Sequence, residues 1–360
     1  MNTLPLPRTL PDYAERAQQM LSPEAWTYFD SGAADELTLR RNVQAWQSWG
    51  LLPRALQDLR GGDTRCQVLG RLWPTPLMVA PMAYQSWAHA DGEEGMALAA
   101  SSQQCGFTLS QHSTTPLEKV AAQMLAEKDR GPLWLQIANG ADRGHLRELI
   151  AQATQSGYEA LVLSVDAPVQ GSRDRIRRQH ALPPAHLRTP QWRAGAAGHS
   201  GLCAGLLEPA LRWDDVAWLQ AESPLPLLLK GLAHPLDAQQ AARLHVAGVI
   251  VSNHGGRVLD TVPATAELLP PIAEALQGDV ALLVDGGIRR GSDVFKALAL
   301  GAQAVLVGRP CLWGLAVGGA RGAAHVLRLL RDEFEMTLAL CGCASPRQIT
   351  RAHLQALTPR

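Results

Sequence analysis

Residues 248–257 read GVIVSNHGGR, a short apolar run that ends in a polar, glycine-rich segment. An apolar run without alternation is typical of a parallel strand that is buried on both faces. Seven other runs have the same character and alternate with helix-length segments: 77–81 (LMVAP), 106–110 (GFTLS), 133–137 (LWLQI), 160–166 (ALVLSVD), 226–231 (PLLLKG), 280–287 (VALLVDGG) and 304–309 (AVLVGR). Eight β/α units predict an α/β fold of the (β/α)8 TIM barrel type, with a doubly wound open sheet as the alternative.

The ends of these runs favour the barrel. Several close on a polar or charged residue: Ser110, Asp166, Lys230, Asn253, Asp285 and Arg309. Catalytic groups of TIM barrels lie at the carboxyl ends of the strands, so we expect these side chains to share one face. Helical patterns between the runs predict helices at residues 92–102, 116–129, 142–156, 235–246, 263–276, 292–300 and 321–340.

Two segments lie outside the repeating units. The first 70 residues precede the barrel and have helical patterns at 10–31 and 34–43, so we expect a helical cap. Residues 167–225 form one connection that is much longer than the others and rich in Pro, Gly, Arg and His between 181 and 205. Because loops of that length are typically lids or disordered segments, we expect a mobile cover over the site. Residues 1–360 as a whole are predicted to form a single domain.

The composition excludes several classes of protein. The 33 basic and 33 acidic residues give a net charge of zero, so there is no excess of cations for a nucleic-acid backbone. Six cysteines without a Cys-x-x-Cys spacing predict reduced thiols and no metal site. The start lacks the apolar core of a signal peptide, and the most apolar long stretch, 297–320, is interrupted by Gln303, Arg309 and Pro310. We expect a cytoplasmic protein without a membrane segment.

The segment at residues 252–257 (SNHGGR) carries the strongest chemical signal. His254 can carry a proton, and the guanidinium of Arg257 can bind a carboxylate through two nitrogens. The two glycines allow the backbone to approach a ligand closely. A surface histidine and arginine in an ordinary glycine turn is the alternative.

Other strand ends also carry charge. Residues 285–289 (DGGIR) and Gly308-Arg309 follow the last two runs, where barrels commonly bind phosphate through backbone amides. Lys230 is either a Schiff-base nucleophile or a fixed cation. Asp166 either orients a histidine or caps the next turn.

Residues 252–260 (SNHGGRVLD), together with residues 285–289, Gly308-Arg309 and Lys230, resemble the FMN-dependent 2-hydroxy acid oxidase and dehydrogenase family, which includes glycolate oxidase and lactate oxidase. The similarity begins near Tyr28, in YFDSGAAD, and continues to Ala344. The resemblance implies a single (β/α)8 domain with FMN at the barrel mouth, and it favours a homotetramer.

The resemblance also implies a role for each matching residue. His254 would remove a proton from the substrate, Asp166 would stabilise the protonated imidazole, and Lys230 would lie beside the flavin as a fixed charge, without forming a Schiff base. Arg257 would bind the substrate carboxylate, with Tyr28 and Arg173 as further substrate contacts. FMN would be bound by Pro81, Met82, Ala83, Ser110, Gln136, Ser164, Lys230, Ser252, Asp285, Gly286, Gly287, Ile288, Arg289, Gly308 and Arg309.

Two positions in the substrate pocket depart from the family pattern. His112 stands where relatives usually have a tryptophan, and Ala138 where they have a tyrosine that hydrogen-bonds the substrate hydroxyl. Loss of that tyrosine either slows the usual reaction or admits a larger substrate, and we favour the larger substrate. His112 either supplies the lost hydrogen bond or is only a polar wall residue.

The predicted activity is FMN-dependent oxidation of an L-2-hydroxy acid to a 2-oxo acid, with oxygen as acceptor and a substrate larger than glycolate or lactate. One alternative is a dehydrogenase that passes electrons to a quinone or a protein. Another is a flavin-binding protein that has lost turnover. The missing pocket aromatics favour that second alternative, and the retained His254, Arg257, Asp166 and Lys230 oppose it.

Overall fold

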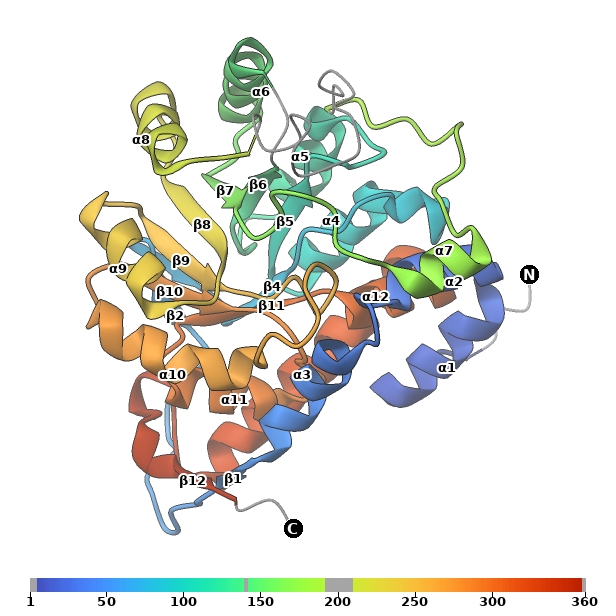
Figure 1. The fold of residues 1–360 in the computed structure, drawn as a ribbon. Helices are drawn as coiled ribbons and strands as arrows, with labels where there is room; N and C mark the ends of the chain where they lie inside the picture. The colour runs from blue at the N-terminus through green and yellow to red at the C-terminus, as the bar shows by residue number, and fades with distance from the viewer. Residues whose placement is uncertain (1–4, 139–141, 192–209, 358–360) are drawn as a thin grey trace.

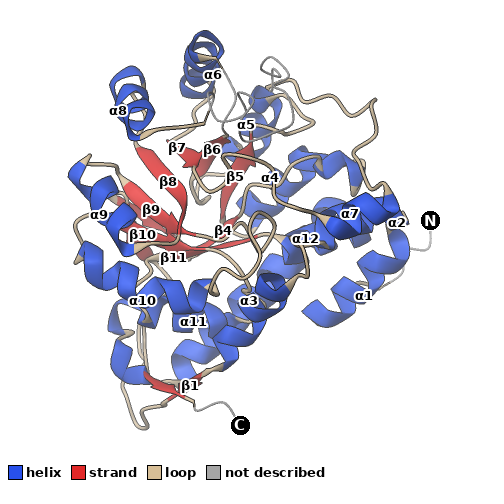
Figure 2. Ribbon diagram, viewed as in Figure 1, coloured by secondary structure: helices blue, strands red, loops and turns tan. Residues whose placement is uncertain are grey.

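The structure, a computed structural model, describes residues 5–138, 142–191 and 210–357. At its centre is a closed barrel of parallel strands in the order β4-β5-β6-β7-β8-β9-β10-β11, with β11 pairing again with β4. Figure 2 shows these strands in red, with the helices around them. The predicted TIM barrel is confirmed, and the open sheet is excluded. The strands are β4 (Leu77–Val79), β5 (Gly106–Ser110), β6 (Leu133–Ile137), β7 (Ala160–Ser164), β8 (Leu227–Leu232), β9 (Gly248–Val251), β10 (Ala281–Val284) and β11 (Ala304–Val307).

Alternate residues of the barrel strands enter two different cores. One set packs with the helices and includes Leu77, Val79, Leu135, Leu161, Leu229, Val249 and Val305. The other set packs with the hairpin of β2 (Cys66–Val68) and β3 (Arg71–Trp73), and includes Met78, Trp134, Val162, Leu228, Ile250, Leu283 and Leu306. Because successive side chains of a strand point to opposite faces, the second set fills the barrel, and the hairpin closes its amino-terminal end. Burial on both faces explains why the runs are continuously apolar.

Helices on the outside of the barrel connect the strands: α4 (Gly92–Ser102), α5 (Leu117–Leu125), α6 (Arg143–Gln155), α9 (Pro235–Arg243), α10 (Thr265–Leu276) and α11 (Gly291–Ala299). Each overlaps a predicted helix. The last predicted helix, from about residue 321, is the second part of α12 (Arg309–Leu340), and the first part, which begins at Arg309, was not predicted. Pro310 fits the first turn of a helix, and the non-helical backbone at Gly318 and Gly319 divides α12 just before the predicted start.

The predicted N-terminal helices are α1 (Leu10–Met20), α2 (Pro23–Asp30) and α3 (Leu37–Gln47). Figure 1 shows them in blue, close to α12. No side chain within the segment caps α3, but the Asp260 carboxylate, after β9, accepts the backbone N–H groups of Leu37 at 3.2 Å and Thr38 at 2.8 Å. The loop after β9 therefore fixes the start of α3. Near the chain ends, β1 (Trp49–Leu51) pairs with β12 (Leu354–Ala356), close to the short 3-10 helices η2 (Pro346–Gln348) and η3 (Arg351–His353).

The long connection contains two helices that the sequence analysis did not predict, α7 (Asp174–Gln179) and α8 (Trp213–Glu222). α7 lies beside α2 (Figure 1), and Arg175 forms ion pairs with Asp30 at 3.0 Å and Glu36 at 2.9 Å. This part of the connection is therefore attached to the N-terminal segment. Residues 192–209 of the predicted lid lie outside the described residues, so the mobile cover stays a prediction.

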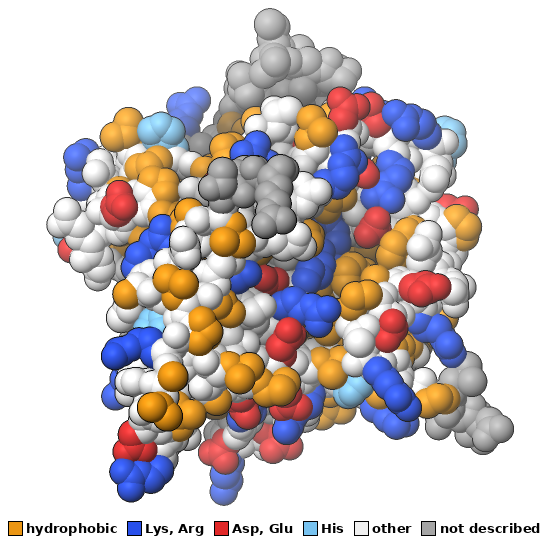
Figure 3. All heavy atoms as spheres, turned by 90° about the horizontal axis from the view of Figure 1, so that it is seen from below, with side chains coloured by type: hydrophobic (Ala, Val, Ile, Leu, Met, Phe, Trp, Pro, Cys, Tyr) orange, Lys and Arg blue, Asp and Glu red, His pale blue; other side chains and the backbone are white. Residues whose placement is uncertain are grey.

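Surface features agree with the composition. Basic and acidic side chains are mixed over the face seen in Figure 3, in keeping with the net charge of zero. Within the described part of the chain, no helix is long and apolar enough to cross a membrane. The cysteines that the structure describes are free and buried: Cys66, Cys105, Cys311, Cys341 and Cys343.

Candidate active site

Polar side chains of neighbouring strands form a series of hydrogen bonds across the barrel mouth. Ser110 Oγ, at the end of β5, donates to Gln136 Oε1 of β6 at 3.0 Å. Gln136 Nε2 donates to Ser164 Oγ, at the end of β7, at 3.2 Å. All three side chains are buried. The structure therefore brings together three of the predicted FMN-binding residues.

Lys230, on β8, is the centre of a second series. Its Nζ lies 2.9 Å from Ser252 Oγ and 2.9 Å from Asp285 Oδ2, which follow β9 and β10. Burial alone lowers the pKa of Lys230, but the charges of Asp285 and Asp166 outweigh it and raise the pKa above its usual value. Because an amine must be neutral to attack a carbonyl, this environment supports a fixed cation and disfavours a Schiff base.

His254 and Asp166 lie within hydrogen-bond distance of each other. Nδ1 of His254 is 3.1 Å from both oxygens of the Asp166 carboxylate. Burial alone raises the pKa of Asp166, but His254 and Lys230 lower it below its usual value, so the carboxylate is ionised at neutral pH. With the Nδ1 proton donated to Asp166, Nε2 is the imidazole nitrogen that can accept a proton.

Three of the predicted ligand-binding arginines are largely buried cations. Burial lowers the pKa of Arg257 to about 9 and the pKa of Arg289 and of Arg309 to about 10. Within the described residues none of the three forms an ion pair, and Asp30, whose charge acts on all of them, is already paired with Arg175. Buried guanidinium groups without a carboxylate partner favour anionic ligands.

The ends of these side chains are held by backbone carbonyls. Arg257 and Arg309 both donate to carbonyl groups of residues 28–31, at the end of α2. Arg257 uses only Nη1 for these bonds, so its other nitrogens are available for a carboxylate. Arg173, at the start of α7, lies close enough for its charge to lower the pKa of Arg257. The buried Nε of Arg173 has no hydrogen-bond partner in the described residues.

The glycines of the two motifs allow α3 to approach the barrel mouth. A Cβ at Gly256 (φ 74°) would lie 2.6 Å from the backbone nitrogen of Leu39, and one at Gly287 (φ 78°) would lie 1.9 Å from the backbone oxygen of Asn42. A ligand was the expected reason for the glycines at 255–256, whereas at Gly256 the group that comes close is α3. Asn42 of α3 also exchanges two side-chain hydrogen bonds with Asn253, at 2.8 Å each. The N-terminal segment is therefore part of the wall of the site.

The predicted substrate residues lie along one side of the mouth. The Tyr28 ring lies 5.3 Å from Arg257 Cζ, and burial raises the pKa of its hydroxyl, which stays a hydrogen-bond donor. His112 follows β5, and burial lowers its pKa to about 4, so its ring is neutral near pH 7. Ala138 follows β6, and its N–H donates to Gln111 Oε1 at 3.0 Å.

Two aromatic residues of this wall were missed by the sequence analysis. Tyr84 and Trp87 belong to the turn and short 3-10 helix η1 (Gln85–Trp87) that follow the predicted FMN-binding residues 81–83. The Tyr84 ring centroid lies 5.8 Å from that of Tyr28 and 6.4 Å from that of His112, and the Trp87 ring lies 5.3 Å from Tyr28. Their only sequence signal was proximity to residues 81–83.

FMN fits the chemistry of these residues. Arg289 and Arg309 would supply cations for its phosphate, and Gly308 caps the start of α12, where backbone N–H groups point outward. Oδ1 of Asp285 is buried and, among the described residues, has no hydrogen-bond donor, so it can accept a hydroxyl of the ribityl chain. Lys230 would supply a positive charge for the flavin ring. Ile288, between the glycines and Arg289, is a buried core residue.

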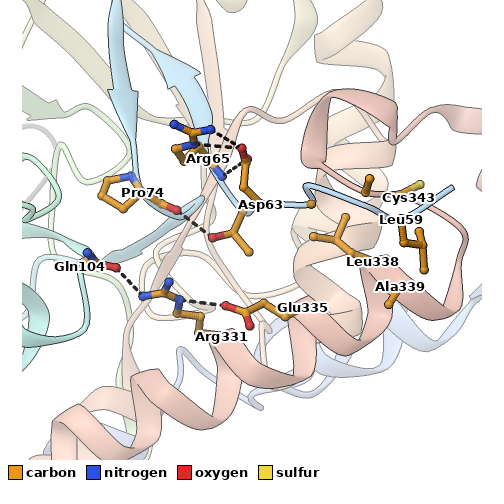
Figure 4. Close-up of a pocket in the computed structure, with 13 residues that line it drawn as sticks. Leu59, Asp63, Arg65, Pro74, Gln104, Arg331, Glu335, Leu338, Ala339 and Cys343 are labelled. Carbon is orange, nitrogen blue, oxygen red and sulfur yellow. Dashed lines mark hydrogen bonds and ion pairs between the residues drawn. The ribbon is translucent and has the colours of Figure 1, made fainter.

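The cavity in Figure 4 is a different place in the molecule. It has a volume of about 490 Å³ and is lined by the segment between β1 and β2, by α12 and by Gln104. Gln104 precedes β5, so the cavity lies at the amino-terminal ends of the strands. Its charged groups are paired, Asp63 with Arg65 and Arg331 with Glu335. Nothing in it belongs to the candidate site.

Comparison with known proteins agrees with the site. The sequence matches the family described as FMN-dependent dehydrogenase over residues 17–356. It is 44% identical to an L-lactate oxidase of Nostoc sp., with 98% of this chain and 100% of the relative covered. It is 41% identical to glycolate oxidase 1 of Zea mays, with 95% and 94% covered. The structure is similar to that of a mandelate oxidase with (S)-2-phenylpropionate, at a TM-score of 0.89 and 34% identity over 98% of this chain and 99% of the other.

The match extends over nearly the whole chain and includes the barrel and the residues at its mouth. The chain therefore belongs to the FMN-dependent dehydrogenase family and is an FMN-dependent oxidoreductase.

Proposed function

We propose that the chain oxidises an L-2-hydroxy acid to the 2-oxo acid, with oxygen as the electron acceptor, and that its substrate is larger than glycolate or lactate. The observation that carries the proposal is one juxtaposition. The His254–Asp166 pair shares the barrel mouth with Arg257 and Arg173, which lack a carboxylate partner within the described residues. A proton acceptor beside cations suits a substrate that carries both a hydroxyl and a carboxylate.

The residues divide the reaction between them. Arg257 and Arg173 bind the carboxylate, which directs the neighbouring hydroxyl to His254. Nε2 of His254 takes the hydroxyl proton, and the Asp166 carboxylate, 3.1 Å from Nδ1, stabilises the resulting charge. FMN, when bound, would supply the two-electron acceptor for oxidation at Cα, so that the substrate C–O bond would become the carbonyl of the 2-oxo acid.

The proposed substrate size depends on position 138. Ala138 follows β6, and its methyl group stands where the family usually has a tyrosine, so the substrate side chain can be larger than that of a two- or three-carbon acid. A relative of known structure is named mandelate oxidase, which supports an aromatic acid, whereas the relative with 44% identity is named L-lactate oxidase. The name oxidase in both supports oxygen as the acceptor.

An anaerobic titration tests the proposal. The purified protein should show a flavin spectrum, and a 2-hydroxy acid added without oxygen should bleach it. We expect mandelate and a long aliphatic 2-hydroxy acid to give a higher kcat/KM than L-lactate and glycolate. Readmission of oxygen should restore the spectrum and release hydrogen peroxide.

Three other outcomes would each contradict one part of the proposal. If the flavin spectrum returns slowly in oxygen but fast after a quinone is added, the protein is a dehydrogenase. A bound flavin that no acid bleaches would indicate a protein that has lost turnover. A higher kcat/KM for glycolate or L-lactate than for the larger acids would contradict the proposed size of the substrate.

A further inference from the structure

We infer that Tyr84 determines which 2-hydroxy acids the site accepts. Its ring forms the wall against which the substrate side chain packs, and it selects acids with an aromatic side chain. The inference rests on the proposed function, because it names the substrate class of the same site and the residue that recognises it.

The position of the Tyr84 ring is the first observation. It lies between two predicted substrate residues, 5.8 Å from the ring of Tyr28 at 75° and 6.4 Å from the ring of His112 at 54°. Tyr28 in turn lies 5.3 Å from Arg257 Cζ. The ring thus extends the row of side chains that begins at the proposed carboxylate-binding group. Edge-on and tilted contacts are the arrangements that aromatic rings prefer.

The backbone of Tyr84 is the second observation. Its φ of 56° and ψ of 40° lie in the left-handed region, which bulky side chains rarely adopt. Glycine would adopt it at less cost. Strain of this kind persists where the surrounding structure enforces it, and such positions cluster at ligand-binding sites.

Glu93, on α4, is the group that enforces this conformation. Its fully buried carboxylate accepts the backbone N–H of Gln85 at 3.0 Å and that of Thr114 at 3.0 Å, and also the hydroxyls of Thr114 at 2.6 Å and Thr115 at 3.0 Å. The Tyr84 N–H donates to the carbonyl of His112 at 3.1 Å. One carboxylate therefore joins the turn that carries Tyr84 to the loop that carries His112.

The order of strands shows where the substrate side chain fits. Tyr84 follows β4, His112 follows β5 and Ala138 follows β6, and these strands are neighbours in the barrel (Figure 1). The aromatic wall therefore extends over two strand ends and stops at Ala138. We therefore expect a flat side chain placed over Ala138 to pack against the rings of Tyr84 and His112, and the shorter methyl group of lactate to leave them uncovered.

The test compares three variants at Tyr84 with a matched control. Tyr84→Gly removes the ring and relieves the backbone, Tyr84→Leu keeps bulk without aromaticity, and Tyr84→Phe keeps the ring. Tyr13→Phe, a tyrosine of α1 whose hydroxyl bonds His325 Nδ1 at 2.9 Å, is the control. For each protein, bound FMN, Tm and the kcat/KM for mandelate and for L-lactate are measured.

We expect the mandelate-to-lactate ratio of kcat/KM to fall about tenfold in Tyr84→Gly and several-fold in Tyr84→Leu. It should stay within threefold of the unmodified protein in Tyr84→Phe and in the control. An unchanged ratio in whichever of the Gly and Leu variants retains FMN would overturn the inference, because a purely structural ring changes Tm and not selectivity. If no 2-hydroxy acid, mandelate, L-lactate and the long aliphatic acid included, bleaches the flavin of the unmodified protein, the proposed function fails instead.

Discussion

Replacing Asp166 with asparagine removes the negative charge next to His254 and leaves the volume of the side chain almost unchanged. Two unit charges about 4 Å apart interact by about 4 kcal/mol at the effective dielectric constant of a protein surface. His254 is 35% exposed in its side chain, so solvent weakens this interaction, and we take half of it, about 2 kcal/mol, as the lower bound. At about 1.36 kcal/mol for each factor of ten, Asp166→Asn should slow the chemical step by roughly 30- to 1,000-fold.

The assay is the rate at which a saturating 2-hydroxy acid bleaches the flavin after rapid anaerobic mixing. Bound FMN should remain equal to that of the unmodified protein, since Asp166 is not among the residues proposed to bind the phosphate. Asp63→Asn, at the opposite end of the barrel where Asp63 pairs with Arg65, is the control and should leave the rate unchanged. A rate within threefold of the unmodified protein in Asp166→Asn would refute the charge-stabilising role of Asp166.

Other changes test other groups. His254→Ala should reduce the rate of flavin reduction by about 10² to 10⁴ while FMN stays bound, and near-normal reduction in a stopped-flow experiment would show that another group takes the proton. Arg257→Lys should weaken substrate binding sharply in a spectral titration, because a lysine cannot bind a carboxylate through two coplanar nitrogens, and unchanged affinity would assign the anion to Arg173. Ala138→Tyr should move the order of kcat/KM values towards small acids, and an equal loss on every acid would disprove the open space. The folded-state pKa of Asp260 lies below its ordinary 3.8, so its carboxylate stabilises the fold above that pH and the stabilisation is lost as the pH falls through the lowered pKa. Asp260→Asn should therefore lower Tm at pH 7. In a pH series of melting curves, the Tm of this variant should fall less steeply below about pH 4 than the Tm of the unmodified protein.

The barrel and its polar strand ends could be predicted because the signal is local. Runs such as 160–166 are continuously apolar, since the strand is buried on both faces, and they end in groups such as Asp166. The same reasoning placed Lys230 and Asp285 at one mouth, where Lys230 Nζ and Asp285 Oδ2 lie 2.9 Å apart. The homotetramer and the cytoplasmic location stay predictions.

Two residues of the substrate-pocket wall, Tyr84 and Trp87, could not be predicted, because their place in the wall depends on contacts between distant segments. Nothing near Tyr84 in the sequence indicates that Glu93 and the carbonyl of His112 hold it in a left-handed conformation. The helix α7 is short, and its Arg175 pairs with residues well over a hundred positions away, Asp30 of α2 and Glu36 before α3. The close approach predicted at Gly256 was correct, but the group that comes close belongs to α3 and not to a ligand.

The attachment of α3 to the barrel mouth also determines when α3 can dock during translation. Asn42 and its partner Asn253 are 211 positions apart, and Asp260 follows a few residues later. At a translation rate of about 5–20 residues per second, the N-terminal helices emerge roughly 10–40 s before the loop that receives them. During that interval the face of α3 that contacts the barrel mouth has no native partner there on the nascent chain. A chain halted on the ribosome before residue 253 should therefore leave α3 open to proteolysis, and protection should arise only once the segment 253–287 has emerged.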